Sequence, residues 1–99
     1  MDAKDVLDCV ENMLTGIKPA EYGSPEESFL RIAVYWTTYL RHKGLLPKDN
    51  SIGVMPHDVA MMMILFKVAR EEFGHKSDNL YDIIGYATLA EVMAENKGD

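Results

Sequence analysis

The feature that most constrains this chain is a run of eight apolar residues, Val59 to Phe66, near its middle. A helix formed by this run has no polar face, so it must lie at the centre of the fold or against a second subunit. A buried strand of the same length is the alternative. The charged residues that follow continue without a turn signal, and methionine favours helix. The sequence therefore predicts a helix over residues 56–73.

Three other segments have apolar residues at helical spacing, and they span residues 2–14, 25–43 and 78–95. No segment of the chain carries a clear strand signal. The sequence therefore predicts an all-α fold, a four-helix bundle that forms a single domain over residues 1–99.

The segment over 25–43 has the clearest helix start. Ser24 is a favourable N-cap, Pro25 suits the first helical position, and Glu27 completes a capping box. The buried stripe predicted for this helix consists of Phe29, Ile32, Ala33, Trp36, Tyr39 and Leu40.

Size and charge limit the partners we expect. The formal net charge of −6 repels a nucleic-acid backbone at long range, so we expect no DNA or RNA partner. The longest apolar run is too short to span a bilayer and the first residues do not resemble a signal peptide, which predicts a cytoplasmic chain without a membrane partner. Small domains gain stability by association, so the run over 59–66 predicts a homo-oligomer.

A polar stripe runs along the helix predicted over 78–95. Asn79, Asp82 and Tyr86 fall at i, i+3 and i+7, at the border of the apolar face. An amide, a carboxylate and a phenol together suit a ribose, a base edge or a metal ion. The alternative is that Asp78 and Asn79 only cap the helix, a position where both residue types are common.

Lys67 and Arg70 are three residues apart and share one face of the helix over 56–73. Two cations beside an apolar surface could bind phosphate, with the arginine supplying a bidentate fork. They could equally form ion pairs with Asp78 and Asp82 across a helix interface. The residues alone leave both interpretations open.

The loop before the second helix adds Lys18 and Tyr22, which lead into a helix N-terminus that favours anions. The three histidines match no metal-binding spacing, and Cys9 is the lone cysteine, so we expect no metal ligand. No phosphate-binding glycine loop or nucleophile elbow is present, so no catalytic residue is predicted.

Five blocks of the sequence resemble a family of small phage and prophage proteins that share a conserved domain of uncharacterised function. The blocks are residues 22–29, 32–36, 56–63, 67–70 and 75–87. The resemblance covers about residues 16 to 95 and implies no activity of its own.

The block over 75–87 also resembles the second motif of the MazG-like all-α NTP pyrophosphatases. In that family an acid precedes an aspartate by three residues, and a tyrosine follows four later. Asp82 and Tyr86 match the pattern, and Asn79 stands where the family has an acid. The family's first metal-binding motif, two glutamates three apart, has no match on the helix over 56–73. The resemblance thus implies a nucleotide-binding bundle, and the departures argue against magnesium-dependent hydrolysis.

These observations predict a non-catalytic, phage-type protein that binds a phosphorylated nucleotide and requires no cofactor. By analogy, it could act as an anti-defence sponge that sequesters a cyclic nucleotide immune signal in the host cytoplasm. One alternative is a MazG-like pyrophosphatase, which would need Mg²⁺, and a second is an inhibitor that binds a host protein. The predicted ligand-binding residues are Lys18, Tyr22, Lys67, Arg70, Asn79, Asp82 and Tyr86.

Overall fold

Four α-helices make up the computed structural model, which describes residues 1–16 and 23–95. They are α1 (Ala3–Thr15), α3 (Pro25–His42), α4 (Pro56–Phe73) and α5 (Ser77–Glu95). Every predicted helix is present with ends within one residue of the prediction, and α4 coincides with it. No strand occurs in the described ranges, so the all-α prediction is confirmed.

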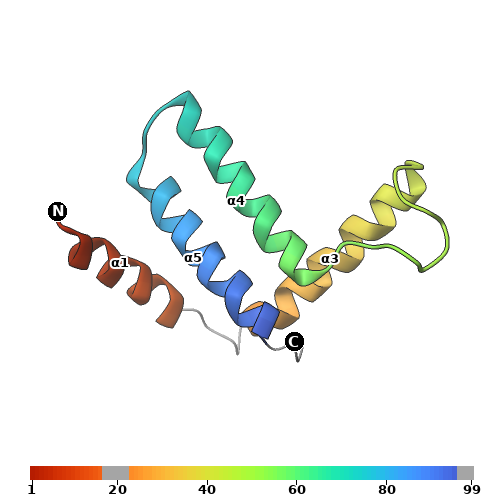
Figure 1. The fold of residues 1–99 in the computed structure, drawn as a ribbon, viewed down its shortest axis with the longest axis horizontal. Helices are drawn as coiled ribbons and strands as arrows, with labels where there is room; N and C mark the ends of the chain where they lie inside the picture. Colours follow the sequence, from red (N-terminus) through yellow and green to blue (C-terminus); the bar gives the residue numbers. More distant parts are fainter. Residues whose placement is uncertain (17–22, 96–99) are drawn as a thin grey trace.

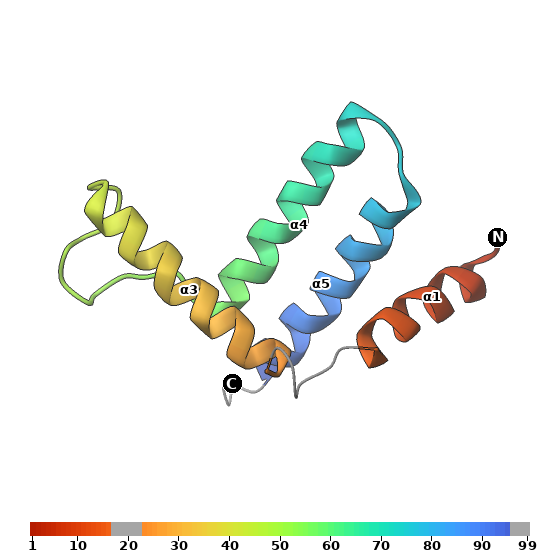
Figure 2. The ribbon, with the colours of Figure 1, turned by 180° about the vertical axis from the view of Figure 1, so that it is seen from behind.

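An antiparallel hairpin of α4 and α5 forms the centre of the molecule (Figure 1). Residues 74–76 connect the two helices at one end of the hairpin. At the open end, where α4 begins and α5 finishes, α3 crosses and packs on α4 (Figure 2). The remaining helix, α1, lies along the outer side of α5 (Figure 1).

The core lies where α3, α4 and α5 meet, at the open end of the hairpin. Its buried residues are Phe29, Ala33, Val59, Ala60, Ala90 and Met93. Ile32 and Trp36 pack against this cluster, as predicted for the stripe on α3. The prediction for Tyr39 is wrong, because its side chain is 62% exposed. Thr37 is buried instead, on the side of α3 that faces Val54.

Side-chain hydrogen bonds hold the connection between α3 and α4 against the end of α3. The Thr37 hydroxyl accepts a bond from the Val54 backbone N–H at 2.8 Å. The Arg41 guanidinium donates to the carbonyl oxygens of Pro47 and Ile52, each at 3.1 Å. Arg41 therefore has a structural role in this connection.

The four helices do not close into a compact bundle. The radius of gyration is 15.3 Å, whereas a compact chain of 99 residues has about 12.6 Å. The principal extents of 49 × 33 × 29 Å also describe an elongated molecule. None of the described helices is long and apolar enough to cross a membrane.

Candidate functional site

The carboxylate of Glu71 organises the turn between α4 and α5. It lies in the last turn of α4 and accepts hydrogen bonds from the Lys76 backbone N–H at 3.0 Å and the Asn79 side-chain amide at 3.2 Å. The ring of His75 bonds to the same carboxylate. A negative charge at the N-terminus of α5 is favourable because the backbone N–H groups there point toward it. Glu71 therefore fixes the geometry of the turn.

These bonds lower the pKa of Glu71. The hydrogen bond with the His75 ring has the largest effect, followed by the bond from the Lys76 backbone N–H. Both bonds favour the ionised carboxylate, because its oxygen atoms accept the protons of the donors. Glu71 is thus held in its charged form by the turn that it organises.

Lys67 and Asp82 form an ion pair across the interface of α4 and α5. The Nζ–Oδ2 distance is 2.9 Å, and the two side chains are only 15% and 24% exposed. The pairing that the sequence left open is therefore present for Lys67. Asp82 directs its carboxylate at this ammonium group rather than at open solvent.

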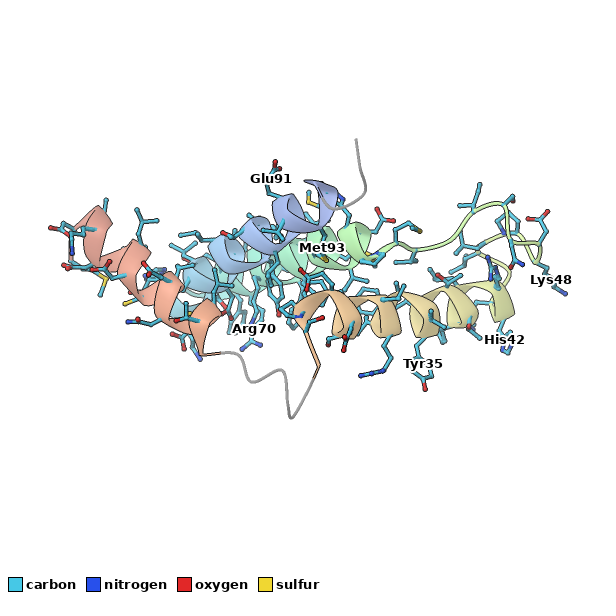
Figure 3. The ribbon with its side chains drawn as sticks, turned by 90° about the horizontal axis from the view of Figure 1, so that it is seen from below. Tyr35, His42, Lys48, Arg70, Glu91 and Met93 are labelled. Carbon is cyan, nitrogen blue, oxygen red and sulfur yellow. The ribbon has the colours of Figure 1, made fainter. Side chains whose placement is uncertain are left out.

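Arg70 has a different environment, although it lies only one turn further along α4. Its side chain is exposed, and its guanidinium carbon lies 5.6 Å from the centre of the Phe66 ring. Within the described residues it forms no ion pair with an acidic side chain. In Figure 3 its side chain projects away from the helices, well apart from the labelled His42 and Lys48. Its guanidinium donors are therefore open to a ligand.

A pocket of about 460 Å³ surrounds Arg70 at the closed end of the hairpin. Its walls are Phe66, Ala69, Arg70, Phe73, Gly74, His75, Lys76 and Asn79. The pocket thus combines two aromatic rings with three basic side chains. This volume falls in the range typical of small-molecule sites.

The other predicted ligand residues are not gathered at this pocket. Asn79 lines it but is only 4% exposed and uses its amide on Glu71. Tyr86 packs against the core, with its ring centre 6.1 Å from that of Phe29. Lys18 and Tyr22 lie outside the described residues.

The sequence analysis did not predict six of the eight pocket residues, and those with aromatic or basic side chains are Phe66, Phe73, His75 and Lys76. Phe66 belongs to the apolar run over 59–66, where core packing is the ordinary role, and Phe73 is the last residue of the predicted helix. The signal that could have found them is the spacing of Phe66, Arg70 and Phe73, which places them on adjoining turns of one helical face.

A magnesium ion does not fit this arrangement. Divalent magnesium needs several carboxylate oxygens that are free to face it. Here Asp82 is paired with Lys67, and Glu71 accepts three hydrogen bonds. Among the described residues, no group of three or more acidic, histidine or cysteine side chains could hold a metal ion.

Comparisons with curated proteins identify two relatives from phages. The chain is 37% identical over 89 residues to the Gene 55 protein of Mycobacterium phage L5, covering 89% of this chain and 51% of that protein. It is 30% identical over 94 residues to the Gene 55 protein of Mycobacterium phage D29, covering 94% and 56%. The chain thus spans about half the length of these relatives.

No solved structure matches the chain. A family described as a domain of unknown function, DUF6378, matches residues 5–94. The predicted resemblance to phage proteins of uncharacterised function is therefore confirmed. Since the match spans nearly the whole sequence, the chain belongs to the DUF6378 family.

Proposed function

We propose that this chain binds a phosphorylated nucleotide, without hydrolysing it, in the pocket at the closed end of the α4–α5 hairpin. The observation that carries the proposal is the environment of Arg70. Its guanidinium group is exposed, lies over the Phe66 ring and has no acidic partner among the described residues. An arginine in this state can offer two parallel hydrogen bonds to a phosphate.

The other walls of the pocket suit the rest of a nucleotide. Lys76 adds a second cationic side chain beside Arg70, in a chain whose formal net charge is −6, whereas the His75 ring is bonded to Glu71. Phe73, whose side chain is 97% exposed, offers an aromatic face on which a base can stack. A ligand with both an anionic and an aromatic part matches this combination better than free phosphate does.

The engaged carboxylates support binding without turnover. Magnesium-dependent hydrolysis would use acids that face the phosphates, and Asp82 and Glu71 are occupied by Lys67 and by the α4–α5 turn. A protein that retains a nucleotide unchanged would serve as a sponge for a nucleotide immune signal, a role that rests on analogy with phage anti-defence proteins.

Native mass spectrometry of the freshly purified protein, followed by calorimetric titration with ATP and with a cyclic dinucleotide, tests the proposal. We expect a retained ligand or stoichiometric binding of one probe. Arg70→Ala should weaken this binding by about ten- to a hundredfold, the usual loss for a charge-assisted contact. Arg31→Ala is the matched control, because Arg31 is an exposed arginine on α3 outside the pocket.

Two results would count against the proposal. If no nucleotide copurifies and neither probe binds the wild-type protein, the pocket is not a nucleotide site. Robust Mg²⁺-dependent release of pyrophosphate from NTPs would instead favour the pyrophosphatase alternative, and Asp82→Ala should then abolish that activity.

A further inference from the structure

One side of α4 remains uncovered although it is almost wholly apolar. Its exposed apolar residues are Met61, Met62, Leu65, Phe66, Val68 and Phe73, which we call the outer face of α4. These residues occupy an arc of about 160° and extend over about 18 Å of helix. The charged residues on this arc, Asp58 and Glu72, lie near its two ends. The opposite side of α4, with Ala60 and Lys67, packs on α3 and α5.

The exposure of individual side chains on this face is high. Phe73 is 97% exposed, Leu65 is 64% exposed and Phe66 is 49% exposed. A monomer gains nothing from large apolar side chains held in water, and contiguous patches of this kind mark interaction surfaces. The outer face of α4 therefore requires an occupant.

The accessible surface of the whole chain is larger than that of a compact monomer. A compact monomer of 11.2 kDa exposes about 5,700 Å². This chain exposes 7132 Å², which is about 1,400 Å² more. A stable dimer buries about 800 Å² on each partner, and obligate homodimers bury more. This excess is spread over the chain, and it is larger than the area that one partner of a standard dimer buries.

We propose that the occupant is a second copy of this chain, packed through the outer face of α4 about a two-fold axis. In such an interface the same residues of the two copies face each other, so a charged residue at the centre would repel its own counterpart. The central residues from Met61 to Ala69 carry no charge on this face. The methionines add flexible side chains that can adapt to an identical partner.

Sedimentation of the wild-type chain and of Leu65→Glu tests this proposal. We expect the wild type at micromolar concentration to have twice the chain mass of 11.2 kDa. Leu65→Glu should weaken dimerisation by at least about a hundredfold, because each dimer buries the new charge twice. Leu45→Glu is the matched control: Leu45 is 69% exposed, lies outside α4 and should leave the dimer intact.

Leu65→Ala keeps the test decisive if the glutamate variant does not fold. It shortens the side chain without adding charge and should weaken dimerisation by about tenfold or more. A wild-type chain that sediments as a monomer would overturn the proposal and leave the face to a different protein. A dimer that survives both changes at Leu65 would show that the copies associate through another surface.

Discussion

Of two cationic side chains on adjoining turns of α4, one is ion-paired and the other is not. Lys67 is paired with Asp82 in the α4–α5 interface, and Arg70 stands in the pocket with its charge unpaired among the described residues. Residues of the same charge, three positions apart, therefore have different functions. The first joins two helices, and the second is available to a ligand.

Mutation should separate these two roles in the ligand-free protein. Lys67→Ala leaves the Asp82 carboxylate partly buried without its partner, so we expect a loss of about 1–2 kcal/mol in the free energy of unfolding. For a chain of this size, the melting temperature should fall by several degrees. Arg70→Ala should change the free energy by less than about 0.5 kcal/mol, as exposed substitutions usually do.

Thermal unfolding followed by circular dichroism measures both variants, and Asp82→Ala with the double variant Lys67→Ala/Asp82→Ala completes a mutant cycle for the ion pair. If Arg70→Ala lowers the melting temperature as much as Lys67→Ala, then Arg70 has a structural partner and the pocket loses its main phosphate contact.

At the scale of elements, the α4–α5 turn depends on the charge of Glu71. Its pKa is lowered chiefly by the hydrogen bond with His75, so the folded chain binds a proton there less readily than the unfolded chain. The resulting stabilisation is complete above the ordinary glutamate pKa of about 4.3. It is lost as the pH falls through the lower pKa of the folded state.

Glu71→Gln should therefore lower the melting temperature at neutral pH, and the difference from wild type should shrink as the pH falls below about 4. Thermal melts between about pH 3 and about pH 7 measure this difference. Glu91→Gln is the control, because Glu91 on α5 is exposed and accepts no side-chain hydrogen bond among the described residues. A Glu71→Gln difference that stays constant with pH would contradict the assigned role.

The existence of the helices could be predicted from the sequence because each has strong local signals. Asp2 and Ser24 cap the first two helices by accepting backbone N–H bonds from Asp5 at 2.9 Å and Glu27 at 3.1 Å. Proline begins α4 as well as α3. These signals act over a few residues, so they do not depend on the tertiary arrangement.

Burial was less predictable, because it depends on which helices meet. Tyr39 follows the apolar spacing of α3 but lies beyond the reach of α4 and α5, and Leu7 on α1 is similarly 59% exposed. Thr37 was not predicted to be buried, because a hydroxyl side chain is not ordinarily a core residue. Its hydroxyl is hydrogen-bonded to the backbone of Val54. Arg70 and Asn79 of the pocket were predicted, but the place of Lys76 beside Arg70 was not, because only the turn that Glu71 holds brings these two residues together.

At the scale of the whole molecule, the open arrangement of helices predicts a stability that depends on protein concentration. If two copies share the outer face of α4, unfolding also separates them, and a higher concentration favours the folded dimer. Each tenfold increase contributes about 1.4 kcal/mol, which should raise the melting temperature by about 3 °C for two chains of this length.

Calorimetry at protein concentrations from about 5 to about 500 µM measures this shift. Leu65→Glu should melt at one temperature throughout that range, whereas Leu45→Glu should follow the wild type. A wild-type melting temperature that is independent of concentration would mean that the elongated chain is stable alone.

Phe66 and Phe73 belong to both the pocket and the outer face of α4. Nucleotide binding and dimerisation are then coupled, because a base bound in the pocket changes the surface that a second copy of the chain can contact. Thermodynamic reciprocity requires that the factor by which a nucleotide alters pairing of the chains equals the factor by which pairing alters nucleotide affinity. A nucleotide bound beside Arg70 would thus act as an effector of assembly, and the apparent affinity for it would vary with the amount of protein in the cell.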